Sequence, residues 1–412
     1  MKATPYWVLL LLACFFSQIR FAICRTMTVL DYGAVPGETI EPSVLLSNCR
    51  AFQEAFDSAV PGDVLVVPAS HTFSLVGGIR AQNLINFTFA LEGRLNCVHN
   101  LSLWPRSSEV QWMNGACKEN CDEAYEDLIA FSNNTALTIR GSVGGESTVD
   151  GNGKHWWNDV LMGLVGTDRP VLISVSYCTG VVVENLHLLN GPHFHLWLSQ
   201  LVDVEVRNVN VTVDRRVQQE IKSQLAQKFQ REEINHTLSS ATLQPWDLNT
   251  DGIDVSGVNV HIHDCYVRND DDSIAVKPAK DSPNFWTQAS VVGALNSTAN
   301  GPRPTECSEN IIIENVELTG FGASVGSVGA KDSPQRACIR NVSWRNVSMP
   351  NTGKGIYVKT NKGCTTKDGT PKTGSITNVR YENVHISNAK WIPIWIGPQQ
   401  QHEPHTDLGQ EW

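Results

Sequence analysis

Val181-Val182-Val183-Glu184-Asn185 introduces a pattern that recurs from about Thr135 onward: a short run rich in β-branched residues, followed by Asn or Asp. The other copies are Val204-Glu205-Val206-Arg207-Asn208, Val260-His261-Ile262-His263-Asp264, Ile311-Ile312-Ile313-Glu314-Asn315, Val342-Ser343-Trp344-Arg345-Asn346 and Val379-Arg380-Tyr381-Glu382-Asn383. The first step, from Asn185 to Asn208, gives a period in the twenties, and later steps contain insertions. Such a period, with short strands and polar turns, is typical of a solenoid and predicts an all-β parallel β-helix. A β-sandwich is the alternative, but hairpin signals such as Asn-Gly are few.

Length and charge restrict the function. At 412 residues the chain can form one large all-β domain, which we expect over residues 25–412. Its formal net charge of -10 argues against a nucleic-acid partner, which needs a clustered basic face. A polyanionic substrate would need a local basic patch, because salt confines the unfavourable field to about 8–10 Å.

The N-terminus predicts export. Residues 1–24 combine Lys2, an apolar run over residues 7–16 and a short-residue ending, as a secretory signal peptide does. The run is about half of the roughly 20 residues of a membrane span, and no later segment is long and apolar enough, so no membrane association is expected after cleavage. Eight Asn-x-Ser/Thr sequons fit a secreted glycoprotein of the extracellular space or cell wall: Asn86, Asn100, Asn133, Asn210, Asn235, Asn296, Asn341 and Asn346.

Cysteines agree with an oxidising compartment. Of eleven, nine remain if Cys14 and Cys24 leave with the signal peptide, so some are expected in disulfides and one can stay free. Cys117-x-x-x-Cys121 could belong to a zinc site, but no second pair with His at ligand spacing accompanies it. A local disulfide is favoured, and no metal is expected.

Three segments depart from the repeat. Residues 213–233 have helical spacing and predict an inserted helix over the rim of the cleft, either a solvated surface helix or a lid that faces substrate. Residues 281–304, rich in Ser, Asn, Gly and Pro, predict a loop. Residues 49–59 fit an amphipathic helix that covers the open end of the solenoid.

Two acidic clusters carry the chemistry, Asn249-Thr250-Asp251-Gly252 and Asp270-Asp271-Asp272-Ser273. The step from Asp251 to Asp272 is close to one solenoid turn, so the two can lie on neighbouring turns with Asp271 beside them. Crowded carboxylates keep one carboxyl protonated near neutrality while another stays ionised, which glycoside hydrolysis requires. Asp and Asn are also common at turns and in calcium sites, and we assign Asp254, Asp264 and Asp270 to turns or the surface.

Several motifs, in order, resemble glycoside hydrolase family 28, the polygalacturonases. They cover most of residues 29–398 and comprise Val29-Leu30-Asp31-Tyr32-Gly33-Ala34, Ala51-Phe52-Gln53, Val149-Asp150-Gly151-Asn152-Gly153 with Trp156-Trp157, Asn249-Thr250-Asp251-Gly252-Ile253-Asp254, Asp271-Asp272-Ser273-Ile274-Ala275-Val276 and Gly326-Ser327-Val328-Gly329. The resemblance implies a right-handed parallel β-helix, no metal or cofactor, and inverting hydrolysis. It also implies that Asp271 is the general acid, that Asp251 and Asp272 activate water, and that Lys359 binds a substrate carboxylate. Asn249 is expected at the substrate as well.

The chain departs from the family pattern at two positions. Phe321, in Gly320-Phe321-Gly322, replaces the motif His, and Tyr357, in Tyr357-Val358-Lys359, replaces the motif Arg. Phe321 cannot share a proton and Tyr357 cannot clamp a carboxylate with a charged fork, but both would suit stacking on a sugar face. His193 and His195 alternate at strand spacing, so they either face the cleft together or are ordinary strand histidines.

These observations predict a monomeric, secreted, glycosylated β-helix glycosidase that acts on a pectin-like or other uronate-containing wall polysaccharide. One alternative is a catalytically inactive carbohydrate-binding or wall-associated relative; a β-helix polysaccharide lyase, which would release unsaturated products, is another. The family usually continues beyond the point that matches Trp412, so an unpaired strand edge is expected at the end of this chain.

Overall fold

The computed structural model describes residues 24–107, 123–144, 147–166, 168–214, 216–217, 220–221, 223–224, 248–279, 307–329, 336–360 and 373–398. The predicted signal peptide (except Cys24), the predicted loop at 281–304, Cys117, Cys121 and Cys364, and the sequons at Asn235 and Asn296 lie outside these ranges. Within them, no helix combines the length and apolar character needed to cross a bilayer.

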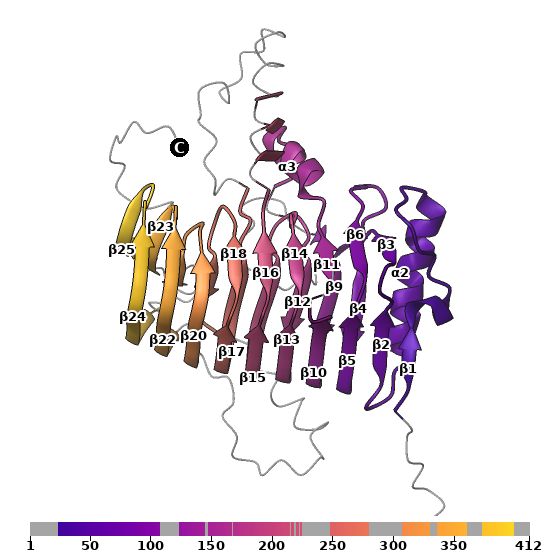
Figure 1. Ribbon diagram of the computed structural model, residues 1–412, viewed down its shortest axis with the longest axis horizontal. Helices are drawn as coiled ribbons and strands as arrows, with labels where there is room; N and C mark the ends of the chain where they lie inside the picture. Colours follow the sequence, from indigo (N-terminus) through magenta and orange to yellow (C-terminus); the bar gives the residue numbers. More distant parts are fainter. Residues whose placement is uncertain are drawn as a thin grey trace, which may run out of the picture.

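Within the described ranges, parallel strands stack along the long axis of the molecule and form one 23-stranded sheet that coils through three rows (Figure 1). The first row contains β1 (Thr26–Thr28), β2 (Val64–Val67), β5 (Ile85–Leu91), β10 (Thr135–Gly141), β13 (Thr179–Glu184) and parts of β15 (Leu196–Arg207), β17 (Ile253–His263), β20 (Cys307–Leu318), β22 (Arg336–Pro350) and β24 (Thr373–Ser387). The second, here called the site row, contains β4 (Ile79–Gln82), β9 (Ile129–Ser132), β12 (Ile173–Ser176), the starts of β15 and β17, β19 (Ile274–Val276), β21 (Ala323–Val328), β23 (Lys354–Thr360) and β25 (Ile392–Pro398). The third contains β3 (Thr72–Leu75), β6 (Arg94–Cys97), β11 (Thr148–Asp150), β14 (His187–Leu189), β16 (Asn210–Thr212), β18 (Tyr266–Arg268) and the ends of β20, β22 and β24. The predicted parallel β-helix is confirmed.

The Asn or Asp that ends each repeat marks a corner between the first and third rows. All six have left-handed backbone, with φ between 51° and 56°: Asn185, Asn208, Asp264, Asn315, Asn346 and Asn383. Asn and Asp tolerate this conformation better than most residues because their short polar side chains bond locally. Neighbouring corners are also linked, since Asn346 donates its amide to Asn315 at 3.1 Å and Asn383 donates to Asn346 at 3.2 Å. The repeat therefore reports a turn geometry that recurs in register.

The two ends of the stack differ. Helix α2 (Pro42–Asp57) packs Phe52 and Phe56 against Phe73, Phe87, Phe89 and Phe131 at the β1–β2 end (Figure 1). This is the predicted end cover, but the helix begins at Pro42 rather than at Cys49, because proline, with its fixed φ, suits the first helical position. At the opposite end, Ile394 and Ile396 of β25 are 56% and 75% exposed.

A helical pair lies beside the strands that lead to the acidic clusters. Helix α3 (Gly153–Leu161) contributes Trp157 and Leu161 to a small apolar cluster with Val213, Ile221 and Leu248. Residues 216–217, 220–221 and 223–224 have helical backbone and Ile221 is buried, whereas Val213 and Asp214, at the start of the predicted insertion, are not helical. Leu248, just ahead of Asp251 in the chain, is thereby anchored.

Cysteines follow the prediction in part. Cys307 and Cys338, on paired strands β20 and β22, form a disulfide. Within the described ranges, Cys24, Cys49, Cys97, Cys178 and Cys265 are free. The remaining short elements are the 3-10 helix η1 (Val29–Tyr32) and an antiparallel pair, β7 (Arg106–Ser107) and β8 (Ala124–Tyr125).

Candidate active site

The register of two strands brings the acidic clusters together. Ile253 of β17 pairs with Ile274 of β19, and the same step along the chain separates Asp251 from Asp272. The two aspartates therefore occupy equivalent positions just before the site row on adjacent turns. Their carboxylate oxygens lie within 4.8 Å of each other. The prediction that they lie on neighbouring turns is confirmed.

The buried side-chain amide of Asn269 fixes the backbone of the two acidic segments. Asn269 donates to the carbonyl oxygens of Thr250 at 2.9 Å and Asp272 at 2.8 Å, which ties the two turns together. The Gly252 N–H also donates to the Asp272 carbonyl at 2.8 Å. A Cβ at Gly252 would lie 2.3 Å from the Ser273 carbonyl oxygen, so glycine is required there by the close approach of the next turn.

Asp272 is the ionised member of the cluster. Its carboxylate accepts hydrogen bonds from Lys277 at 2.9 Å, from Lys359, and from the Ser324 hydroxyl at 2.8 Å. Burial alone would raise the pKa of Asp272, but the two ammonium groups outweigh it and hold that pKa below its ordinary value. Lys359, predicted to bind a substrate carboxylate, therefore neutralises a carboxylate of the protein in this structure.

Asp271, the next residue back, has the opposite titration behaviour. Burial and the neighbouring Asp272 carboxylate raise its pKa to about 8. One oxygen accepts the Asp272 N–H at 2.8 Å, while Oδ2 has no hydrogen-bond partner among the described residues. Asp271 is consequently protonated at neutral pH, with a carboxyl that can donate.

Asp251 is fixed from two sides. Asn249 donates its amide to Asp251 Oδ1 at 2.8 Å, so this predicted substrate residue orients a carboxyl group. His195 donates its Nδ1–H to the Asp251 carbonyl at 2.8 Å, and its Nε2 accepts the Gly191 N–H. Burial, followed by the charges of Asp271, Asp254 and Asp272, raises the pKa of Asp251 well above its ordinary value.

Asp254 belongs to the same cluster, and its assignment to a turn or the surface is wrong. It lies buried in β17, and its Oδ2 is 3.4 Å from Lys277. Strand alternation explains the placement, because Ile253 and Val255 point into the core and Asp254 points outward. Oxygens of Asp251, Asp254 and Asp272 lie close enough to bind a cation, and the Lys277 ammonium, 2.9–3.9 Å from all three, supplies that charge.

The two histidines before β15 do not alternate along a strand. His193 and His195 lie in the connection between β14 and β15, and both are buried. His193 stacks on Phe194 with ring centroids 3.9 Å apart. Burial, assisted by the nearby Arg169 charge, lowers the pKa of His193, and burial lowers that of His195 to about 4, so both are neutral.

Phe321 and Tyr357 form a covered aromatic group beside the carboxylates. Tyr357 is 0% exposed and Phe321 is 2% exposed, and their rings meet edge to face at 5.8 Å. The buried Lys354 ammonium lies 4.0 Å from the Tyr357 ring centroid and 4.1 Å from that of Trp391. Neither predicted stacking residue offers an open ring face here, because the lysine already occupies the faces of these rings.

Sequence reasoning missed four contributors to the cluster: Asp254, Lys277, Ser324 and Asn269. Three of them follow a signal that the sequence does carry. Asp254 and Ser324 stand at outward strand positions with apolar neighbours, and Lys277 continues the alternation of Ala275. Asn269 had no such signal, because its role depends on the approach of two turns.

The fold and the cluster together define a parallel β-helix that carries an acidic site on one of its sheet rows. Residues 107–410, about three quarters of the chain, match the family described as Glycosyl hydrolases family 28. The chain belongs to this family.

Named relatives agree with this membership. The chain is 24% identical over 394 residues to a "Probable polygalacturonase" from Vitis vinifera, an alignment that covers 93% of the chain and 66% of that protein. It is 23% identical over 364 residues to a "Polygalacturonase" from Cryptomeria japonica, covering 84% and 52% respectively. It is 25% identical over 348 residues to a "Probable endo-xylogalacturonan hydrolase A" from Aspergillus oryzae, covering 83% and 67%. The chain thus spans between half and two thirds of these relatives' lengths.

Solved structures share the fold at low identity. The endo-xylogalacturonan hydrolase from Aspergillus tubingensis superposes with a TM-score of 0.60 at 19% identity, covering 92% of this chain and 79% of that one. An exopolygalacturonase from Thermotoga maritima gives 0.60 at 18% identity, covering 95% and 80%. Both support the right-handed parallel β-helix.

Proposed function

We propose that this protein is a secreted, inverting glycoside hydrolase that cleaves glycosidic bonds in a pectin-like or other uronate-containing cell-wall polysaccharide. The observation that carries the proposal is the opposite titration of two adjacent carboxyls. Asp271 has its pKa raised to about 8, while two lysines hold the pKa of Asp272 low. Family membership supports the same chemistry.

The roles follow from these protonation states. Asp271 donates its proton to the glycosidic oxygen of the leaving group, and the Asp272 carboxylate takes a proton from the attacking water on the opposite face of the sugar. Asp251, whose pKa is also raised, orients that water, and the hydrogen bond from Asn249 holds the Asp251 carboxyl in place. Metal chemistry is not required, because Lys277 supplies the positive charge among the carboxylates.

Lys359 links substrate charge to catalysis in this proposal. A uronate carboxylate that attracts the Lys359 ammonium would weaken the Lys359–Asp272 pair. The pKa of Asp272 would then rise, which makes Asp272 a stronger base once substrate is bound. A neutral sugar at the same position would leave Asp272 fully neutralised and weakly basic.

Secretion and glycosylation belong to the proposal. Residues 1–24 act as a signal peptide, and the sequons at Asn86, Asn133, Asn210, Asn341 and Asn346 are exposed. The mature protein acts as a monomer, outside the cell or in the wall, on a polysaccharide.

One observation favours a second candidate, an inactive carbohydrate-binding relative. Asp251, Asp271 and Asp272 expose only 3%, 3% and 1% of their surface, so a sugar reaches them only after part of their cover moves. The positions of the motif His and Arg are taken by buried aromatic rings. A protein whose cover never opens would bind polymer without turnover.

Reducing-sugar release from a panel of pectic, algal and neutral glycans tests the proposal. The wild type should release reducing ends from at least one uronate polymer without the ultraviolet absorbance of lyase products. Asp271→Asn should lower kcat by about 10²–10⁴-fold while polymer binding persists. Asp264→Asn, at an exposed corner, is the matched control and should keep wild-type turnover. Binding without release by the wild type would instead establish the inactive relative.

A further inference from the structure

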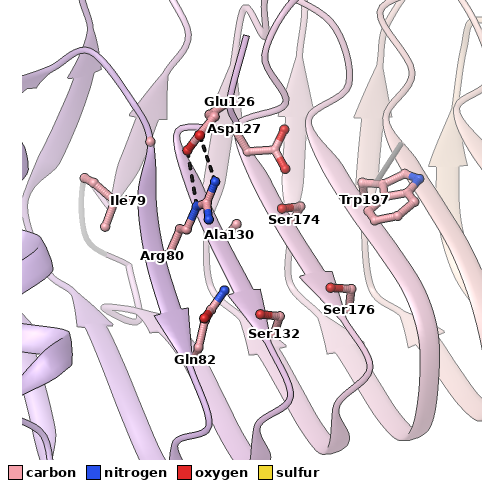
Figure 2. Close-up of a pocket in the computed structure, with 11 residues that line it drawn as sticks. Ile79, Arg80, Gln82, Glu126, Asp127, Ala130, Ser132, Ser174, Ser176 and Trp197 are labelled. Atoms are coloured by element: carbon pink, nitrogen blue, oxygen red, sulfur yellow. Dashed lines mark hydrogen bonds and ion pairs between the residues drawn. The ribbon is translucent and has the colours of Figure 1, made fainter. Parts of the chain in front are cut away.

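A recess lies on the site row next to the acidic cluster, on the side toward β4. A cavity of about 200 Å³ is lined by Arg80, Glu126, Asp127, Ser132, Ser174 and Trp197, among other residues (Figure 2). Arg80, Ala130, Ser174 and Trp197 pair in register across β4, β9, β12 and β15, and Trp197 pairs with Asp254. The recess therefore begins one strand before the cluster and runs toward the β4 end of the same sheet face, at about 4.8 Å per strand.

The charges in this recess do not favour an anion. The Arg80 guanidinium donates to both oxygens of Glu126, at 2.8 and 3.3 Å, so its charge is neutralised within the protein. Asp127 adds a carboxylate, which accepts the Val171 N–H at 3.2 Å. Among the described lining residues the one cation is therefore already paired, so the recess offers no available positive charge to a uronate carboxylate.

The other polar groups in the recess are uncharged. Ser132, Ser174 and Ser176 present hydroxyls from adjacent strands, and Figure 2 shows them on one side of the sheet with Gln82. None of these three hydroxyls hydrogen-bonds to another described residue. Trp197 lies at the end of the recess nearest the acidic cluster, because it pairs with Asp254. Hydroxyls that both donate and accept, next to an aromatic ring, match the hydroxyl-rich and partly apolar surface of a sugar.

We propose that this recess is a binding site for a neutral sugar unit of the polysaccharide, such as an uncharged pentose or hexose branch, held while the cluster cleaves a neighbouring bond. Its volume, below the roughly 300–1,000 Å³ of drug-sized pockets, limits it to one small unit. The choice of a uronate polysaccharide as the ligand rests on the proposed function, but binding of the neutral unit in the recess does not require the protein to cleave it. It makes the preferred substrate a uronate backbone with neutral decoration, rather than an unbranched polyuronate.

Binding measurements on a variant without turnover test the recess. The full-length Asp271→Asn variant is titrated by calorimetry with a galacturonate oligomer and with the same oligomer carrying neutral xylose branches. The branched oligomer should bind at least about tenfold more tightly. Ala130→Tyr, added on the floor of the recess, should abolish this difference by filling the space. Thr138→Tyr, on β10 in the first row, is the matched control and should preserve it.

A second variant tests how the negative charge of Asp127 affects binding. Asp127→Asn keeps the oxygen that accepts the Val171 N–H but removes the negative charge, so affinity for the unbranched oligomer should rise about three- to tenfold. Equal binding of the two oligomers, or a preference that survives Ala130→Tyr, would overturn the inference. Tight binding of the branched oligomer with no cleavage by the wild type would support the recess and refute only the hydrolase.

Discussion

The acidic cluster and the neutral-sugar recess occupy the same face of the same row of strands, yet they handle charge differently. In the cluster, the Lys359–Asp272 ion pair has side chains that are only 5% and 2% exposed. In the recess, the Arg80–Glu126 pair has side chains that are 38% and 15% exposed. Similar ions a few strands apart therefore meet different dielectric surroundings.

The difference in solvent exposure between the two ion pairs determines where acid–base chemistry can occur. Removing water from a charge raises the energy of its ionised form, so the cluster can hold Asp271 protonated beside an ionised Asp272. The recess leaves its ion pair partly exposed to solvent, which suits it to recognition. A solenoid can vary these surroundings strand by strand because its core requires only that alternate positions stay apolar.

The largest expected effect comes from breaking the buried pair. Lys359→Met leaves Asp272 with only Lys277 as a cationic partner and should lower the free energy of unfolding by about 3–5 kcal/mol. Turnover should fall as well. Urea denaturation followed by fluorescence measures the change.

Two further variants make this measurement specific. Lys154→Met removes an exposed lysine 3.8 Å from Glu220 and should cost less than about 1 kcal/mol. Combining Lys359→Met with Asp272→Asn should recover part of the loss, because no buried carboxylate is then left underneutralised. A loss below about 1 kcal/mol for Lys359→Met would show that the cluster is as well hydrated as the recess.

The next effect is a pH dependence of the acidic cluster. Asp271 has its pKa raised from 3.8 to about 8, so the folded protein keeps a proton that the unfolded chain loses. This group's contribution to stability is complete below about pH 4 and is lost as the pH rises toward 8, at up to about 1.4 kcal/mol per unit. Activity should fall about tenfold per pH unit above 8, as the general acid loses its proton.

Asp271→Asn isolates the contribution of Asp271 to the pH dependence of the free energy of unfolding. The difference in unfolding free energy between wild type and variant should shift in favour of the variant as the pH rises from 5 to 8. Asp272 acts with the opposite sign, because its lowered pKa contributes stability that is lost as the pH falls below about 4. Parallel stability profiles for wild type and Asp271→Asn would contradict the raised pKa.

The sequence contained most of the fold because the solenoid repeats a local rule. A β-branched run followed by Asn or Asp identified corners that the structure places at φ values of 51–56°. Helix α2 starts at Pro42, before the predicted start at Cys49, because proline initiates the helix ahead of the apolar spacing that begins at Cys49. The buried Phe321 and Tyr357 could not be inferred, since their cover comes from Lys354 and from rings distant in sequence.

The acidic cluster was partly predictable, because the regular length of a solenoid turn relates positions on adjacent turns. The step from Asp251 to Asp272, about one turn of the solenoid, sufficed to place the two on adjacent turns. The partners of Asp272 were not predictable from spacing, because Lys359 is far away in sequence and reaches it across β21. Charge balance in a solenoid depends on which turns are neighbours, and insertions of variable length hide that in the sequence.

The smallest effect is expected at the recess. Glu126→Gln keeps the shape of the side chain but removes the partner charge of Arg80. Since this pair is partly hydrated, the free energy of unfolding should change by less than about 1 kcal/mol, measured as for Lys359→Met. Binding should change more than stability: the recess loses one carboxylate charge, so the calorimetric preference for the branched over the unbranched oligomer should narrow. A loss of several kcal/mol on Glu126→Gln would mean that the Arg80–Glu126 pair is held as tightly as Lys359–Asp272, and the contrast between the two regions would disappear.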